Sequence, residues 1–116
     1  MRRTGLVVLV TCPSRASARR LAAQLIRSRV AACVNLIGRV ESLFWWKGKS
    51  ESAREYLLII KTSQARFEAL RLAIVARHPY EVPEVIALPI VAGHQPYLAW
   101  VHQAVRPASR NEHGTS

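Results

Sequence analysis

Residues 33–47 read as one β-strand that is too long for a chain of this size to cover. From Val34 onward the even positions are mostly apolar, and residues 47–49 (KGK) then supply a turn. Fifteen extended residues reach about 50 Å, whereas typical strands have about five or six residues. The far half of this strand must therefore project from the domain or fold back at Gly38.

The projecting half carries a cluster of apolar side chains. This cluster, which we call the hairpin tip, consists of Leu43, Phe44, Trp45 and Trp46. Large apolar side chains on an uncovered strand edge promote aggregation, so we expect them to form an oligomer interface with further copies of the chain. The alternative is a bend at Gly38 that folds the strand back over its own domain. Gly38 is a β-bulge candidate in either case.

The remaining elements complete a β-α-β-β-α-β order followed by a C-terminal helix. Strands are predicted at 6–11, 33–47, 53–62 and 84–90. Helices are predicted after Pro13 to about Arg29, after Ser63 to Arg77 or His78, and from Pro96 onward. This order is that of the α+β, ferredoxin-like split βαβ sandwich. Right-handed crossovers then give an antiparallel sheet of strand order 4-1-3-2 with helices on one face.

Helix boundaries and buried faces follow from caps and periodicity. Ser14 or Ser17 is the predicted N-cap of the first helix and Ser63 that of the second, which must stop before Pro79. The expected inward residues of the last two helices are Phe67, Leu70, Ala73 and Ile74, and Tyr97, Trp100, Val101, Ala104 and Val105.

The length of 116 residues fits one domain. We assign residues 1–106 to it and expect the polar segment 107–116 to be a disordered tail. No apolar run approaches the roughly 18 residues of a membrane span, and residues 6–10 are too short for a signal-peptide core, so we expect a cytoplasmic protein without membrane contact. Two cysteines give no disulfide framework.

The chain is strongly basic, with 17 Lys+Arg against 7 acidic residues and a formal net charge of +10. Such a charge makes binding to a polyanion conceivable. The arginines are, however, scattered from Arg2 to Arg110 rather than clustered. We therefore regard nucleic acid as an unlikely partner despite the charge.

Five sequence blocks resemble the CutA divalent-cation tolerance proteins, in the family's order and spacing. They are residues 31–35 (AACVN), 44–49 (FWWKGK), 60–62 (IKT), 78–90 (HPYEVPEVIALPI) and 97–100 (YLAW). The resemblance covers roughly residues 6–105 and departs from the family at Gly38-Arg39 and in the more apolar hairpin tip. It implies a ferredoxin-like subunit in a homotrimer, similar to the P-II signalling proteins. It also implies a role in tolerance of copper and other divalent metals, without catalysis.

The strand directions of the predicted sheet place Cys12, Cys33 and His78 at the same end of the sheet. Cys33 and His78 also match family positions implicated in copper binding, which makes them the candidate metal ligands. No cofactor is required, and copper(II) or another divalent ion is the candidate ligand. The alternatives are that Cys33 is a small buried residue and that His78 merely ends a helix. An expected separation of about 10 Å between strands 1 and 2 argues against a Cys12–Cys33 disulfide.

A second functional class is a P-II-like sensor that binds a small ligand in clefts between subunits. Lys61, Tyr80 and Glu84 are the candidate cleft residues, although Glu84 also suits a structural role at the entry to the last strand. No glycine-rich phosphate loop or nucleophile–base pair is present, so we do not expect an enzyme.

Overall fold

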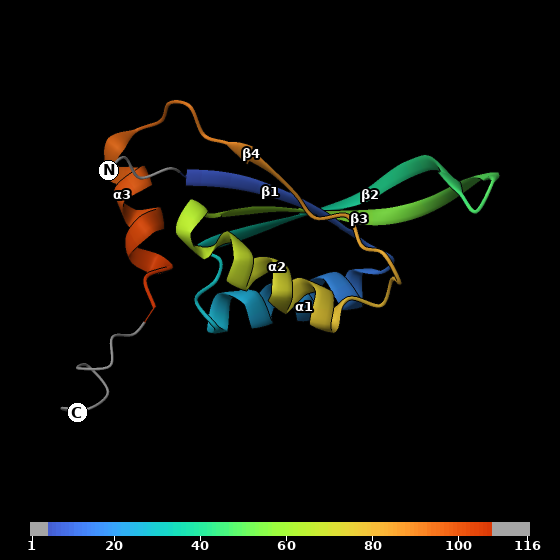
Figure 1. Ribbon diagram of the computed structural model, residues 1–116, viewed down its shortest axis with the longest axis horizontal. Coiled ribbons are helices and arrows are strands. Elements are labelled where there is room, and N and C mark those ends of the chain that lie inside the picture. Colours follow the sequence, from blue (N-terminus) through green and yellow to red (C-terminus); the bar gives the residue numbers. More distant parts are fainter. Residues whose placement is uncertain (1–4, 108–116) are drawn as a thin grey trace.

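The computed structural model describes residues 5–107, and Figure 1 shows their arrangement. The elements are β1 (Gly5–Cys12), α1 (Arg15–Arg27), β2 (Cys33–Trp46), β3 (Lys49–Ser63), the 3₁₀ turn η1 (Gln64–Arg66), α2 (Phe67–Arg77), β4 (Ile86–Pro89) and α3 (Gln95–Ala104). The sheet order is β2-β3-β1-β4 with antiparallel neighbours, which confirms the predicted ferredoxin-like order. Apart from Pro107, the predicted tail lies outside the described residues, as do residues 1–4.

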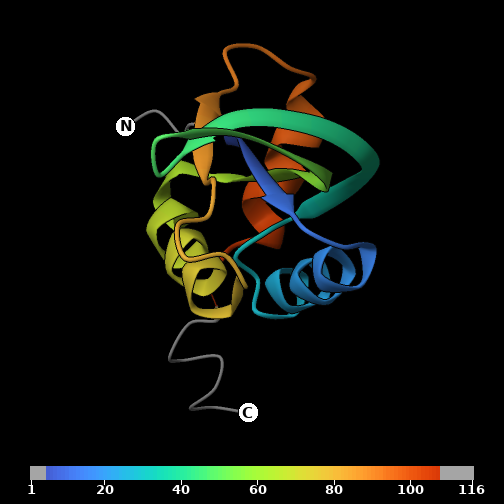
Figure 2. The ribbon, with the colours of Figure 1, turned by 90° about the vertical axis from the view of Figure 1, so that its right-hand side faces the viewer.

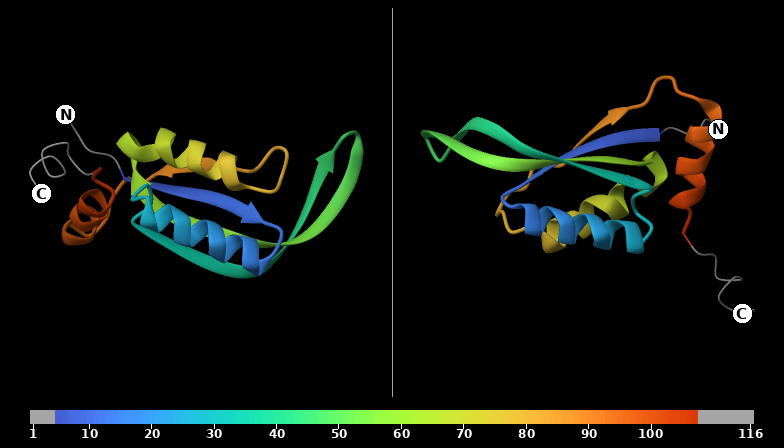
Figure 3. Two further views of the ribbon diagram at one scale, coloured as in Figure 1. Left: turned by 90° about the horizontal axis from the view of Figure 1, so that it is seen from below. Right: turned by 180° about the vertical axis from the view of Figure 1, so that it is seen from behind.

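Helices α1 and α2 lie side by side on one face of the sheet, and α3 packs near one end of it (Figures 2 and 3). The core between the sheet and these helices comes from alternate strand positions, as a half-covered strand requires. Its fully buried strand and helix residues include Val8, Val10, Cys12, Leu25, Leu58, Ile60, Leu70 and Ile74. In the described chain, no helix is both long and apolar enough to cross a membrane.

Helix α1 begins where the sequence indicates. The Ser14 hydroxyl accepts the Ser17 backbone N–H at 3.1 Å, and the Ser17 hydroxyl oxygen accepts the Ser14 backbone N–H in return. This reciprocal capping box satisfies backbone donors that the first turn leaves unpaired. Ser14 rather than Ser17 is therefore the N-cap.

The opposite face of the sheet is also apolar, and no helix among residues 5–107 covers it. Register places Val7, Leu9, Leu57 and Ile59 on this open face, together with Ile37, Ile86 and Leu88 from the outer strands. The first four are half-buried, while Ile37, Ile86 and Leu88 are exposed. The sheet thus presents two apolar faces of which the domain covers one.

Strands β2 and β3 form a hairpin that extends beyond the rest of the sheet (Figure 1). Trp46 pairs with Lys49 across the two-residue turn Lys47-Gly48, whose φ values of 53° and 78° are typical of a type I′ turn. The prediction that strand 3 begins at residue 53 is therefore wrong. The polar residues 49–52 pair with the aromatic end of β2, because the turn fixes the register.

The hairpin tip is exposed in the single chain. Leu43 and Trp45 are 73% and 77% exposed, and Phe44 and Trp46 about 40%. One loose ion pair, Lys47 to Glu81 at 4.0 Å, joins the turn to the loop before β4, and such exposed pairs contribute little stability. The hairpin therefore does not cover its own apolar side chains.

Three predictions need correction. Ser63 does not cap α2, because the turn η1 intervenes and the Ser63 side chain makes no capping hydrogen bond. The last strand is shorter than 84–90, and its four residues are exposed because β4 is an edge strand that pairs only with β1. In α3, Val101 and Val105 are buried, but Tyr97 and Trp100 are 41% and 47% exposed.

A β-bulge interrupts the hairpin between Gly38 and Val40, as the sequence predicts. The Tyr56 ring lies across Gly38, so that a Cβ added at Gly38 would stand 1.9 Å from the ring carbon Cε2. Gly38 is required here because the aromatic ring occupies the space of a side chain.

We expect Gly38→Ala to destabilise the fold by about 1–3 kcal/mol, the range for overpacking a filled site. Urea unfolding of the wild type, Gly38→Ala, Tyr56→Leu and the double variant measures this. Since the clash is with Tyr56, Tyr56→Leu should recover most of the loss caused by Gly38→Ala. Additive effects of the two substitutions would contradict this explanation.

Candidate functional site

Cys12 and Cys33 lie toward opposite ends of the sheet, so the prediction that Cys12, Cys33 and His78 share one end is wrong. Cys12 pairs with Tyr56 on β3, whereas Cys33 pairs with Lys61 on the same strand. These partners are five positions apart on β3, which corresponds to about 17 Å along the strand. The physical reason is that β1 and β2 both run antiparallel to β3, so the start of β2 lies beside the start of β1.

His78 lies at the end of β1 and has both ring nitrogens engaged. The Tyr80 backbone N–H donates to Nδ1 at 3.1 Å, and Nε2 lies 2.7 Å from the Thr11 carbonyl oxygen. A backbone N–H can only donate and a carbonyl can only accept, so Nδ1 is the acceptor and Nε2 carries the proton. This neutral tautomer has no free lone pair for a metal ion.

A group of buried polar side chains surrounds this position. The Tyr80 hydroxyl donates to Glu55 Oε2 at 2.6 Å, and the Glu55 side chain is almost completely buried. Burial, with the Glu55 carboxylate as a second cause, raises the pKa of the Cys12 thiol to about 11. The same two causes raise the pKa of Glu84 above its ordinary value. Burial also raises the pKa of Tyr80, with its hydrogen bond to Glu55 as the second cause. Ionisation of further groups is therefore disfavoured at this end.

The other end of the sheet carries Cys33 on the open face. Lys61, its cross-strand partner, donates through Nζ to Asn35 Oδ1, and the Cys33 thiol contacts the same oxygen at 3.8 Å. Burial raises the pKa of the Tyr97 phenol on α3. The electrostatic influence of the nearby Cys33 thiol is the second cause. Cys33 is half-buried in the single chain, whereas Cys12 is fully buried.

The positions of these residues limit which metal or ligand sites a single chain can form. Within residues 5–107, no group of three or more His, Cys, Asp or Glu side chains is arranged to hold a metal ion. Lys61 also lies at the opposite end of the sheet from Tyr80 and Glu84. A cleft lined by all three predicted residues would therefore need two subunits.

Sequence reasoning missed Glu55 and Asn35. Glu55 is an acidic residue at the beginning of the apolar stretch of β3, and such a residue usually needs a buried partner. Asn35 stands two residues after Cys33 on the same strand and hence on the same face. Both signals were present in the sequence, but neither identifies the partner side chain.

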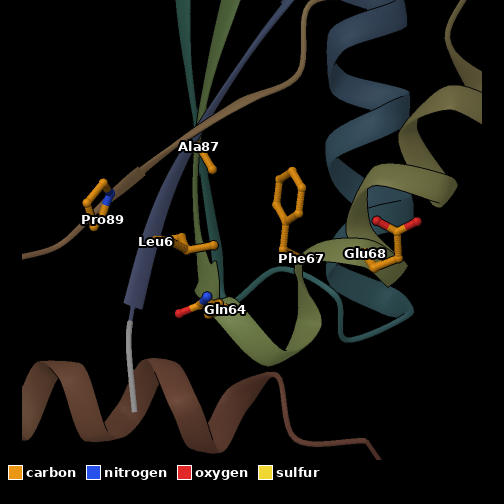
Figure 4. Close-up of a pocket in the computed structure, with 6 residues that line it drawn as sticks. All are labelled: Leu6, Gln64, Phe67, Glu68, Ala87 and Pro89. Carbon is orange, nitrogen blue, oxygen red and sulfur yellow. The ribbon is translucent and has the colours of Figure 1, made fainter. Parts of the chain in front are cut away.

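A pocket of about 430 Å³ lies between β4, β1 and the start of α2 (Figure 4). Its lining residues are Leu6, Gln64, Phe67, Glu68, Ala87 and Pro89. Glu68 is engaged by the Arg71 guanidinium, which lowers the pKa of its carboxyl. None of the predicted site residues lines this pocket. Leu6 pairs with Thr62, next to Lys61, so the pocket lies toward the Cys33 end of the sheet, but Leu6 is a core residue whereas Cys33 lies on the open face.

We expect the stability of this protein to fall as the pH rises from 9 to 11, partly because of Cys12. The unfolded thiol ionises near its ordinary pKa of 9.0 and the folded one near 11. Above pH 9 the unfolded state therefore binds fewer protons, and the folded state loses at most about 3 kcal/mol by pH 11. Urea unfolding against pH should give a shallower decline for Cys12→Ala, whereas parallel curves would contradict the assignment to Cys12.

Residues 6–104 match the family model described as CutA1 divalent ion tolerance protein. The chain is 46% identical over 102 residues to Protein CutA 1, chloroplastic, of Oryza sativa, covering 88% of the chain and 58% of that protein. It is 42% identical over 97 residues to the divalent-cation tolerance protein CutA of Thermus thermophilus, covering 84% and 94%. The chain spans a little over half the length of the plant and mammalian relatives it matches.

Solved structures give the same result. The Thermus thermophilus Cut A1 structure superposes with a TM-score of 0.86 at 40% identity, covering 88% of this chain and 99% of that one. CutA1 from Oryza sativa superposes with a TM-score of 0.87 at 44% identity, covering 90% and 96%. The sequence match and the shared fold together establish that this chain belongs to the CutA1 divalent ion tolerance family.

Proposed function

We propose that this chain acts in tolerance of divalent metal ions, as a cytoplasmic homotrimer that binds copper weakly and catalyses no reaction. The observation that carries this proposal is the family match over residues 6–104. Cys12 and Cys33 are both free thiols, which agrees with a reducing compartment.

Two surfaces support self-association. The open face of the sheet exposes Ile37, Ile86 and Leu88, and the hairpin tip exposes two tryptophans, Trp45 and Trp46. Removing apolar surface from water stabilises a protein by roughly 25 cal/mol per Å². Burial of these large apolar side chains between copies of the chain would therefore be favourable. A closed ring of three copies would cover both surfaces without leaving a free edge.

Metal binding in this proposal centres on Cys33. Its thiolate is a soft ligand, which suits copper, and the sulfur lies on the open face that the trimer would enclose. His78 of the same chain lies too far away to share the ion, so a Cys33–His78 pair would come from two subunits. Since His78 must first release the Tyr80 N–H, we expect it to contribute less than Cys33.

Light scattering should give a mass of three chains for the wild type. Replacing Phe44 and Trp46 by serine should weaken the trimer, because it removes apolar area at the interface. Replacing Ser50 and Ser52 by alanine on the partner strand is the matched control and should leave the mass unchanged. A wild-type monomer at micromolar concentration would rule out the homotrimer.

Calorimetric titration with copper(II), and with redox-inert zinc(II), tests the metal site. We expect Cys33→Ser to lower the affinity by at least about tenfold, the effect that even loss of an outer-shell partner produces. His78→Ala should have a smaller effect, and the buried Cys12→Ala serves as a control. If Cys33→Ser binds as the wild type does, Cys33 is not a ligand, although the trimer proposal would stand.

A further inference from the structure

The structure gathers four of the arginines on one face of α1. The residues that form this arginine face are Arg15, Arg19, Arg20 and Arg27, and all four are exposed. At 100° per residue they occupy an arc of about 140°, opposite the buried residues of the helix. They span about 18 Å along the axis. The helical spacing of these residues in the sequence thus produces a clustered basic face on the folded surface.

The face has an internal order. Arg15 and Arg19 form one row, Arg20 and Arg27 form a second, and the rows lie roughly 100° apart around the helix. Between them lie Ala16 and Ala23, which are also exposed. The result is a narrow strip of small side chains. Arg15 and Arg19 flank its first half on one side, and Arg20 and Arg27 flank its second half on the other side.

No acidic group in the described part of the chain forms an ion pair with this face. Among residues 5–107 the ion pairs are Lys47–Glu81 and Glu68–Arg71, and α1 itself contains no Asp or Glu. Helix stability does not explain the arrangement either. Like charges at i and i+4, such as Arg15 and Arg19, destabilise a helix, and cations in its first turn oppose the helix dipole.

We propose that the arginine face binds a flexible, linear phosphate polyanion of which inorganic polyphosphate is the simplest example. The guanidinium fork matches phosphate oxygens with paired hydrogen bonds. A single chain of phosphates can follow the alanine strip and contact both rows. This proposal does not depend on the metal-related function.

The shape and composition of the face decide between phosphate polymers. Single-stranded nucleic acid is held by aromatic side chains that stack on bases, and α1 contains none. Duplex nucleic acid is stiff, with a persistence length of about 50 nm, so it touches a convex helix over a short distance. A flexible chain of phosphates can instead curve along the whole strip.

Calorimetric titration of the full chain with long-chain inorganic polyphosphate at several salt concentrations tests the proposal. The charge variant replaces the four arginines of the face by glutamine, which is also a good helix former. Its affinity should fall steeply. The slope of log affinity against log salt should decrease by about 3, the value for four phosphate contacts on a flexible strand.

Two further variants separate this site from general electrostatics. The matched control replaces Arg39, Lys49, Arg54 and Arg106 by glutamine, which removes the same charge from exposed positions elsewhere. It should retain most of the affinity. The floor variant, Ala16→Gln with Ala23→Gln, keeps the charge but fills the strip, and it should bind more weakly than the wild type with an unchanged salt slope.

Three results would overturn the proposal. The first is an equal loss in the charge variant and the matched control, which would indicate diffuse attraction. The second is a floor variant that binds as the wild type does. The third is a DNA duplex of equal total charge that binds as tightly as polyphosphate. Circular dichroism of every variant confirms that α1 is intact.

Discussion

The sheet of this domain is apolar on both faces, and its own helices cover only one. Alternation in β1 and β3 sends Val8, Val10, Leu58 and Ile60 into the core beneath α1 and α2. The intervening positions are apolar as well and lie on the open face. A four-stranded sheet with this pattern needs a second covering layer, and the long β2–β3 hairpin leaves an apolar tip with the same need. The self-association proposed above would meet both requirements at once.

The block HPYEVPEVIALPI has a mainly structural role in the single chain. Pro79 ends α2 by forcing His78 into an extended conformation, with φ −78° and ψ 138°. The following loop then passes the end of β1, where His78 bonds Thr11 and Tyr80 bonds Glu55. These contacts fix the loop to the end of β1 and to the Glu55 side chain of β3. A histidine held in this way stabilises the loop and is a poor metal ligand.

Much of the fold could be predicted because local physics sets it. The Ser14 cap, the Gly38 bulge, the Lys47-Gly48 turn and the proline stop after His78 each follow from the conformational preferences of a few adjacent residues. The strand order followed from the handedness of the crossovers. The errors occurred where packing decides. Tyr97 and Trp100 have the helical spacing of a buried face, yet α3 buries only the narrower stripe around Val101 and Val105.

The sequence by itself determined the element order, the family and the apolar pattern of each strand, since these depend on near neighbours along the chain. The tertiary structure decided which chemical groups meet. Strand direction separates Cys33 from His78, and backbone partners use both nitrogens of that histidine. Such encounters depend on strand register and direction, which arise only when distant segments pack together.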